Sequence, residues 1–245
     1  MNSKFTTLTF SILFCLTSHF VHAQKVFLGG GGSASMPVVN YENYSYSSSL
    51  FGGHSGQVKY VVTSSDGNFL YFETIDVWTG IKRIHKVNAN TLEYLDQLSL
   101  TYGAYDLEIS DDDAYLFFHS FTKLYKMNTA NMIIEDSISL DSFSFIEVFD
   151  NNTVFCSSLN KIQVVDFSSG EVTEIPTSSG GHLDMVFNSD KTKLYTLKAS
   201  PHKILIIDVN TLSIENEMNI EGTTGLPWDI ALDGDDQYIY AFFEE

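Results

Sequence analysis

The chain has 245 residues, and 31 acidic residues against 13 basic ones give it a formal charge of −18 at pH 7. Such an acidic surface repels nucleic-acid phosphates and anionic lipid headgroups, so nucleic acid is not expected as a partner. A chain of this length can bury an apolar core without the help of disulfides.

Residues 1–23 have the pattern of a secretory signal peptide. Lys4 precedes an apolar stretch at residues 10–16, and a small-residue exit ends at Ala23. The apolar stretch is too short and too interrupted by Thr and Ser to span a bilayer. We therefore expect a cleaved signal and a mature chain that begins near Gln24. It would be secreted, periplasmic or at the cell surface, without membrane insertion.

Two cysteines are present, and Cys15 would leave with the signal. Cys156 is then alone, which excludes an internal disulfide. It stands between Phe155 and Ser157 in an apolar segment, and we expect it to be a small buried hydrophobic residue.

Residues 24–58 form a lead-in rich in Gly, Ser and Tyr. Two short segments, 26–28 and 38–41, have strand-like composition and flank the sequence GGGGSAS at 29–35, which is flexible by composition. We expect these segments to be closing strands for the repeats that follow.

Residues 59–245 repeat one pattern. An aspartate that follows a short apolar segment recurs every 38 to 46 residues, at Asp66, Asp112, Asp150, Asp190 and Asp235. A second anchor keeps step with the first, at Asn88, Asn128, Asp166 and Asp208. Repeats of this period are typical of an array of one supersecondary unit.

Each unit has the composition of a four-stranded antiparallel meander. Asp, Asn, Gly and Ser at the anchors favour turns, a third strand starts with Lys or Arg, and the fourth strand is the most polar. Small sheets of this kind bury their faces by stacking around an axis. The sequence therefore predicts an all-β fold, a β-propeller with four whole blades and a fifth of two strands. Either the lead-in completes the ring, or the chain is a piece of a longer propeller.

The sequences SDKTKLYTL at 189–197 and KILIIDVNT at 203–211 resemble YVTN-type propeller repeats, the family that includes surface-layer and lactonase-like propellers. The resemblance covers about residues 59–245 and implies the blade architecture; the repeat serves many activities. A glycine occupies the first turn only as Gly67, and no copy spells YVTN. A WD40-like assignment is less favoured, because Trp228 and Asp229 precede a first strand.

Three aspartates stand six positions before a repeat aspartate: Asp106, Asp184 and Asp229. This position is the entry to the innermost strand, so we expect the three at one mouth of the central channel, with His182 and Trp228 beside them. Converging carboxylates are the ligands that Ca²⁺ or another divalent ion prefers. The alternative interpretation is that these aspartates cap backbone amides where loops enter strands.

Two other patterns are weaker indications of function. The acidic clusters at 111–113 and at 233, 235 and 236 lack the spacing of an EF-hand, so we expect solvated turn tips. Ser55 in GHSGQ lacks the second glycine and the strand-turn-helix context of a nucleophile elbow.

Two functions remain open. The first is an exported binding or scaffold module for a protein, a glycan or a small ligand at the channel mouth, with no catalytic residue. The alternative is a lactonase-like hydrolase in which the three aspartates and His182 hold a divalent metal that polarises a carbonyl group. We favour binding, because no catalytic set is assembled in the sequence.

Overall fold

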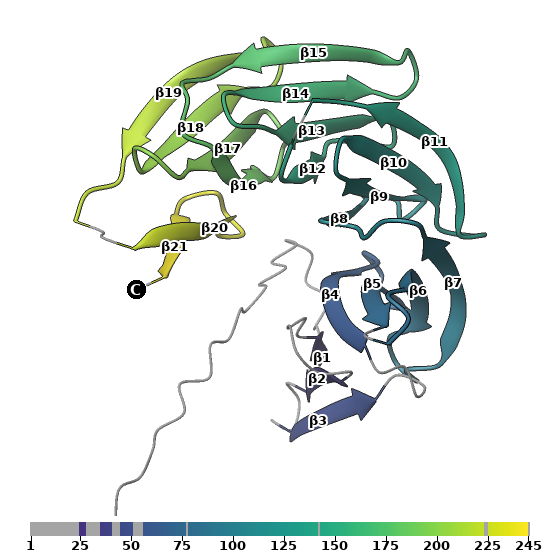
Figure 1. The fold of residues 1–245 in the computed structure, drawn as a ribbon. Helices are drawn as coiled ribbons and strands as arrows, with labels where there is room; N and C mark the ends of the chain where they lie inside the picture. The colour runs from purple at the N-terminus through teal and green to yellow at the C-terminus, as the bar shows by residue number, and fades with distance from the viewer. Residues whose placement is uncertain are drawn as a thin grey trace, which may run out of the picture.

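The computed structural model describes residues 25–27, 35–40, 45–50, 56–76, 78–141, 143–222 and 225–244. Every regular element in these ranges is a β-strand. The strands form separate antiparallel sheets that follow one another along an arc (Figure 1). The predicted all-β fold and the four-stranded blades of a β-propeller are therefore confirmed.

In the described part of the chain, four sheets are complete blades whose strands pair in chain order. Blade 1 consists of β4 (Gly56–Thr63), β5 (Phe69–Asp76), β6 (Lys82–Asn88) and β7 (Tyr94–Leu100). Blade 2 consists of β8 (Leu107–Ile109), β9 (Tyr115–Ser120), β10 (Lys123–Asn128) and β11 (Ile133–Ser139). Blade 3 consists of β12 (Ile146–Val148), β13 (Thr153–Ser157), β14 (Lys161–Asp166) and β15 (Glu171–Pro176). Blade 4 consists of β16 (His182–Phe187), β17 (Lys193–Lys198), β18 (Lys203–Asp208) and β19 (Ser213–Asn219).

A half-blade of two strands, β20 (Leu226–Leu232) and β21 (Ile239–Glu244), follows blade 4. The first strands of the blades lie on the inside of the arc and contact one another in order, from β4 through β8, β12 and β16 to β20. The fourth strands lie outermost (Figure 1), and their residues are mostly exposed, as in β19. The predicted rise in polarity toward the rim is confirmed.

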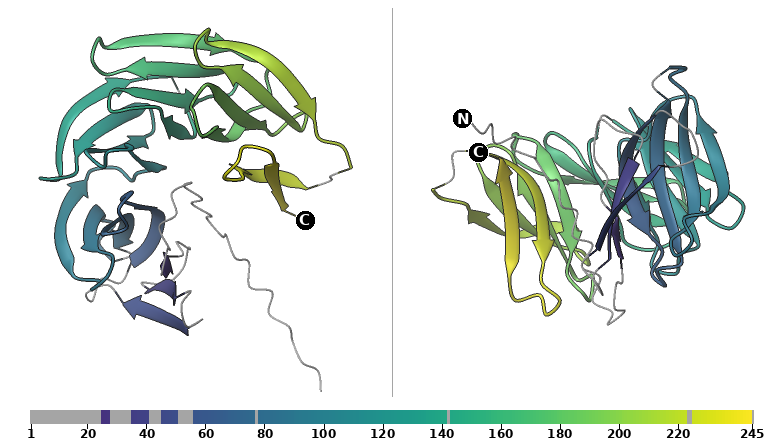
Figure 2. Two further views of the ribbon diagram at one scale, coloured as in Figure 1. Left: turned by 180° about the vertical axis from the view of Figure 1, so that it is seen from behind. Right: turned by 90° about the horizontal axis from the view of Figure 1, so that it is seen from below.

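The antiparallel meander gives the propeller two different ends, seen in side view in the right panel of Figure 2. The turns between first and second strands and between third and fourth strands lie at one end, which we call the turn end. The turns between second and third strands and the links from one blade to the next lie at the other end, which we call the connection end. Asp106, Asp184 and Asp229 all belong to the connection end.

The core consists of apolar layers between neighbouring blades. Adjacent residues of a second strand point to opposite faces, and Phe117 and Phe118 accordingly pack in two different layers, toward blade 3 and blade 1. Cys156 is fully buried in the layer between blades 2 and 3. Burial also raises the pKa of its thiol. The prediction of a small buried hydrophobic residue at this position is confirmed.

At the turn end, aspartates join neighbouring blades. Asp113 accepts hydrogen bonds from the backbone N–H (2.7 Å) and the hydroxyl (2.8 Å) of Ser65, and Asp236 accepts the same pair of bonds from Ser189 (2.9 and 2.5 Å). Both aspartates have a positive φ, 60° and 56°, at the position that Gly67 takes in blade 1. Asp and Asn tolerate this backbone region better than most residues. Asp113 and Asp236 therefore lie in exposed turns, as predicted, and in addition link neighbouring blades.

The lead-in forms a sheet of its own from β1 (Lys25–Phe27), β2 (Ser35–Asn40) and β3 (Ser45–Leu50). In its register Lys25 lies opposite Asn40, and Val39 lies opposite Tyr46. This sheet lies beside blade 1, where β2 contacts β4 (Figure 1). Among the described strands, β20 and β21 pair only with each other. The expected pairing of the lead-in with the half-blade is thus not among the strand pairs of these ranges.

Candidate functional site at the connection end

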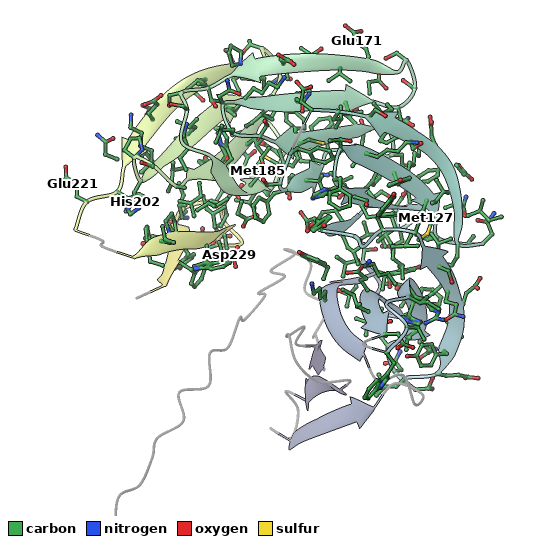
Figure 3. All side chains as sticks on the ribbon, in the orientation of Figure 1. Met127, Glu171, Met185, His202, Glu221 and Asp229 are labelled. Carbon is green, nitrogen blue, oxygen red and sulfur yellow. The ribbon has the colours of Figure 1, made fainter. Side chains whose placement is uncertain are left out.

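Asp184 and Asp229 meet at the inner strands of blade 4 and the half-blade, where Figure 3 labels Asp229. Each follows a β-bulge, because the register shifts between His182 and Asp184 and between Pro227 and Asp229. Bulges re-aim the side chains that follow them, and here the two carboxyl groups share a hydrogen bond. Burial, and then the hydrogen bond and the charge of Asp229, raise the pKa of Asp184 well above its usual range. The neighbouring carboxyl group therefore favours the protonated form of Asp184.

Asp106 does not join this pair. Its Oδ1 accepts the N–H of Leu107 at 3.0 Å, and its Oδ2 accepts the N–H of Ile146 in blade 3 at 3.0 Å. Burial raises the pKa of Asp106 to about 6, against the opposing effect of these two bonds. The structure thus brings two of the three aspartates together. The alternative interpretation, in which the aspartates cap backbone amides where loops enter strands, describes the two hydrogen bonds of Asp106.

Carboxylates that accept a backbone N–H of the next blade recur along the inside of the arc. Glu73 Oε1 accepts the N–H of Ala104 at 2.8 Å between blades 1 and 2, and Glu147 Oε1 accepts the N–H of Phe187 at 3.3 Å between blades 3 and 4. Asp106 links blades 2 and 3, and Asp184 Oδ2 links blade 4 to the half-blade through the N–H of Ile230 at 3.0 Å. We call these four carboxylates the inner carboxylates.

The sequence analysis missed two acidic residues of the channel, Glu108 in β8 and Glu147 in β12. Burial, and then the charges of Glu147 and Asp106, raise the pKa of Glu108 well above its usual range. Burial raises the pKa of Glu147 to about 8. Burial and neighbouring negative charges both favour the protonated form of such carboxyl groups. The sequence feature that indicates these two residues is a single acidic residue between two apolar ones in the short inner strand, as in LEI and IEV.

His182 is buried, with 3% of its surface exposed. Its Nε2 lies 2.8 Å from Thr177 Oγ1, and its Nδ1 lies 2.9 Å from Thr196 Oγ1. Burial, and then the charge of Lys198, lower the pKa of His182 to about 4, so the ring is neutral at pH 7. Because both ring nitrogens are engaged, His182 fastens the loop before β16 to β17 and offers neither a metal ligand nor a base.

The other predicted residue, Trp228, fills the bulge of β20 and has 61% of its surface exposed at the connection end. Its indole ring is therefore accessible to a ligand. It is one of several large apolar side chains that are exposed at this end, together with Trp78, Ile81, Tyr102, Tyr105, Phe121, Leu159 and Leu226.

The predicted divalent metal does not fit these residues. Within the described ranges, no group of three or more His, Cys, Asp or Glu side chains is arranged to hold a metal ion. Asp184 accepts the N–H of Ile230, Asp106 caps two amides, and both nitrogens of His182 are bonded. The metal centre of the lactonase-like alternative is thus not assembled in this part of the chain.

Three exposed aromatic rings gather where blade 1 passes into blade 2, and we call them the aromatic shelf: Tyr102, Tyr105 and Phe121. The ring of Phe121 lies 5.5 Å from that of Tyr102 and 5.5 Å from that of Tyr105, both edge to face. These contacts hold the three rings in a fixed arrangement. Between 42% and 58% of each side chain is nevertheless exposed.

A polar depression of about 480 Å³ opens between blades 3 and 4 at the same end. We call it the polar pocket, and it is lined by Asp141, Ser144, Ser158, Leu159, Asn160, Lys161, Gly181 and His182. Its size falls in the range of small-ligand sites. Its lining includes hydroxyl, amide and charged groups, and Leu159, 68% exposed, supplies an apolar side chain.

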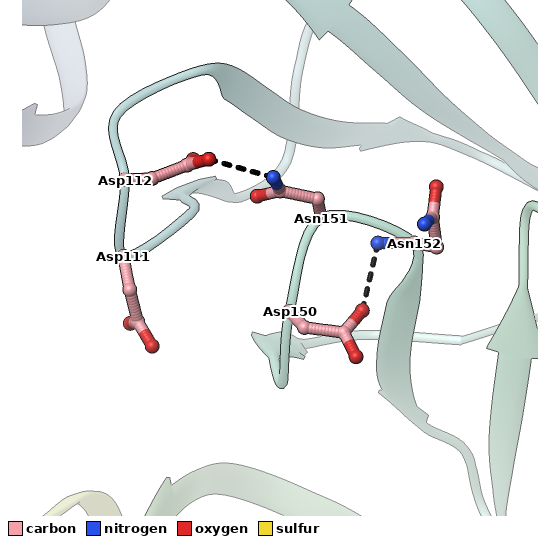
Figure 4. A pocket seen from close by; sticks show the side chains of 5 residues that line it. All are labelled: Asp111, Asp112, Asp150, Asn151 and Asn152. Carbon is pink, nitrogen blue, oxygen red and sulfur yellow. Dashed lines mark hydrogen bonds between the residues drawn. The ribbon is translucent and has the colours of Figure 1, made fainter.

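A smaller hollow at the turn end, of about 280 Å³, is acidic (Figure 4). Asp112 Oδ2 accepts a bond from the Asn151 side-chain amide at 2.7 Å, and Asp150 Oδ1 accepts the N–H of Asn152 at 2.8 Å. These acids therefore already serve the turns of blades 2 and 3. The connection end is the better candidate site, because it combines a pocket with exposed aromatic rings.

No family model matches the chain, and no curated protein matches it. No helix in the described residues is long and apolar enough to cross a bilayer. Among solved structures, the chain is similar to one titled Kuenenia stuttgartiensis hydrazine synthase, with a TM-score of 0.72 and 16% identity over 89% of this chain and 70% of that one. It is one of 1122 matching chains. At this identity the likeness shows the fold alone, and the function has to be argued from the residues.

Proposed function

We propose that this protein is an exported β-propeller that binds its ligand at the connection end. The observation that carries the proposal is the joint presence, at that end, of the aromatic shelf and the polar pocket. Exposed large apolar side chains that gather on one face are typical of interaction sites. Aromatic rings with a polar edge are favoured at such sites, because they bury area at little entropic cost.

Export rests on residues 1–23, whose composition is that of a cleaved signal. We also propose that the repeats are of the YVTN type. This proposal rests on the sequences at 189–197 and 203–211, which include most of β17 and all of β18. Export is tested by expressing the full chain in a secreting host and sequencing the amino terminus of the exported protein. We expect it to start at Gln24, and retention of an uncleaved chain in the cytoplasm would contradict export.

The binding face is tested with two matched tyrosines. Tyr105 belongs to the aromatic shelf, whereas Tyr238, 62% exposed, lies at the turn end of the half-blade. We expect Tyr105→Ser to weaken ligand binding at least tenfold and Tyr238→Ser to leave it unchanged, as measured by calorimetry with any ligand found in a screen of peptides, glycans and metabolites. Equal affinities in the two variants would overturn the assignment of the connection end.

No observation favours the hydrolase over binding, since the residues proposed for its metal do not form a metal site in the described ranges.

A further inference from the structure

We infer that the ligand of the connection end is a neutral oligosaccharide, an inference that rests on the proposed function and specifies it. A sugar ring has a face of C–H groups and an edge of hydroxyl groups. It therefore requires an aromatic surface for the face and neutral hydrogen-bonding groups for the edge. The aromatic shelf and the polar pocket offer these two features at one end of the molecule.

The backbone of Phe121 is the first argument for a role of the shelf. Phe121 lies in the two-residue turn between β9 and β10, has a φ of 53° and is 58% exposed. A bulky side chain is strained in this region of φ, where glycine fits without cost. An exposed ring contributes little to the core, so stability does not account for a phenylalanine here. Leu92, Met132 and Leu212 have a similar positive φ, but their side chains are buried or half-buried. The exposed ring of Phe121 is the one of these that is available to a ligand.

The charges of the polar pocket favour a neutral ligand. Lys161 Nζ lies 2.5 Å from Asp141 Oδ2 and 2.5 Å from Glu174 Oε1, so its charge is already balanced by two carboxylates. His182 is neutral at pH 7 and bonded through both ring nitrogens. Among the described residues that line the pocket, no cation is left to pair with an anionic ligand. The excess of acidic residues in the chain further disfavours anions.

The shelf and the pocket are connected through His119. Tyr105 stacks on His119, with ring centroids 5.7 Å apart and an angle of 28° between the planes. His119 Nε2 lies 3.0 Å from the backbone oxygen of Ser144, and Ser144 lines the pocket. The shelf lies between blades 1 and 2, and the pocket lies between blades 3 and 4. A ligand that touches both is therefore longer than one sugar ring.

The test uses the mature chain, residues 24–245, and neutral hexasaccharides of glucose, xylose, mannose and N-acetylglucosamine in calorimetry. We expect at least one of them to bind and Phe121→Gly to weaken its binding at least tenfold. Because glycine relieves the backbone strain, the melting temperature of this variant should fall by no more than about 3 °C or should rise. Tyr238→Ser is the control for a surface ring at the other end and should bind as the parent protein does.

Two results separate this inference from the proposed function. In the first, none of the hexasaccharides binds at millimolar concentration, but a peptide or a metabolite binds the parent and no longer binds Tyr105→Ser. The oligosaccharide inference is then wrong, and the assignment of the binding site to the connection end is retained. If binding of every ligand is the same in Tyr105→Ser, Phe121→Gly and the parent, both are wrong. A hexasaccharide that binds Phe121→Gly and the parent equally well also overturns the oligosaccharide inference at the shelf.

Discussion

Asp184 accepts an N–H of the neighbouring blade while it lies against a second carboxyl group. Only its acceptor atom is needed for the bond to Ile230, whereas its negative charge is opposed by burial and by Asp229. Asparagine retains the acceptor and removes the charge. Alanine removes both and leaves the N–H of Ile230 without its acceptor.

We therefore expect Asp184→Asn to change the free energy of unfolding by less than about 0.5 kcal/mol at pH 7, and Asp184→Ala to lower it by about 1–3 kcal/mol. Urea unfolding of the two variants beside the parent measures the difference. Equal destabilisation by both substitutions would show that the charge, and not the acceptor, is what the fold uses at this position.

At the scale of single residues, the sequence predicted that the aspartates lie at strand entries and, in one of its two interpretations, that they cap backbone amides, but not which amide each one accepts. Their position six residues before the repeat aspartate identifies the entry to the inner strand. The amide that Asp106 accepts, that of Ile146, belongs to the next copy. The hydrogen-bond partner therefore depends on how neighbouring copies are stacked. The sequence pattern of a single copy does not specify this arrangement.

Among the second strands of the four blades and the half-blade, β21 has the least cover. Tyr240 and Phe242 of β21 are 48% and 46% exposed, whereas Phe155 of the second strand in blade 3 is 1% exposed. One face of the half-blade packs on blade 4 through Ile230, Ile239 and Ala241. A strand with one packed face opens locally at a lower free energy than a strand with two.

We expect the amides of β21 to exchange with deuterium at least a hundredfold faster than those of β17, the matching second strand of blade 4. Native-state exchange followed by mass spectrometry compares the two strands in one sample. Similar protection of β21 and β17 would mean that the half-blade is covered on its second face in solution.

At the scale of elements, the strands of the blades were predictable because the information is local. Turn-forming residues and short apolar segments alternate in phase through residues 59–245. The pairing of the lead-in was less predictable, since strand composition does not specify a partner. Segments 25–27 and 35–40 pair with each other across a short link, which costs less loop-closure entropy than pairing with the far end of the chain.

Stability of the whole molecule should depend on pH in an unusual way. Burial raises the pKa of Glu73 to about 7, that of Asp106 to about 6 and that of Glu147 to about 8. Between about pH 4 and pH 8 these three groups therefore hold more protons in the folded state than in the unfolded state, and their contribution to the free energy of unfolding falls as the pH rises through this window. For Glu73 alone the loss is on the order of 3 kcal/mol.

The turn aspartates act in the opposite direction. Hydrogen bonds from neighbouring turn residues lower the pKa of several of them, such as Asp66 and Asp190. Their contribution is present above the unfolded pKa near 4 and is lost as the pH falls through the lower, folded values. Burial also lowers the pKa of His119 and His182 to about 4, so their contribution is present above the unfolded pKa near 6.5 and is lost as the pH falls toward 4. The fall in stability with rising pH is therefore clearest between about pH 6.5 and pH 8, where the histidines no longer titrate.

Urea midpoints from pH 3 to pH 9 measure this profile. Glu73→Gln keeps an acceptor for the N–H of Ala104 and removes the titrating group, so we expect the decline between about pH 6.5 and pH 8 to become shallower. A parent protein whose midpoint rises over this window would contradict the raised pKa values of the inner carboxylates.

The carboxylate that each blade extends to the next has a consequence for the history of the chain. Since every such bond reaches only the following copy, inserting or deleting one unit of about 40 residues would leave the remaining junctions chemically intact. Duplication can therefore lengthen or shorten the arc without a redesign of its joints, and the number of copies, more than any single side chain, sets how far the circle extends.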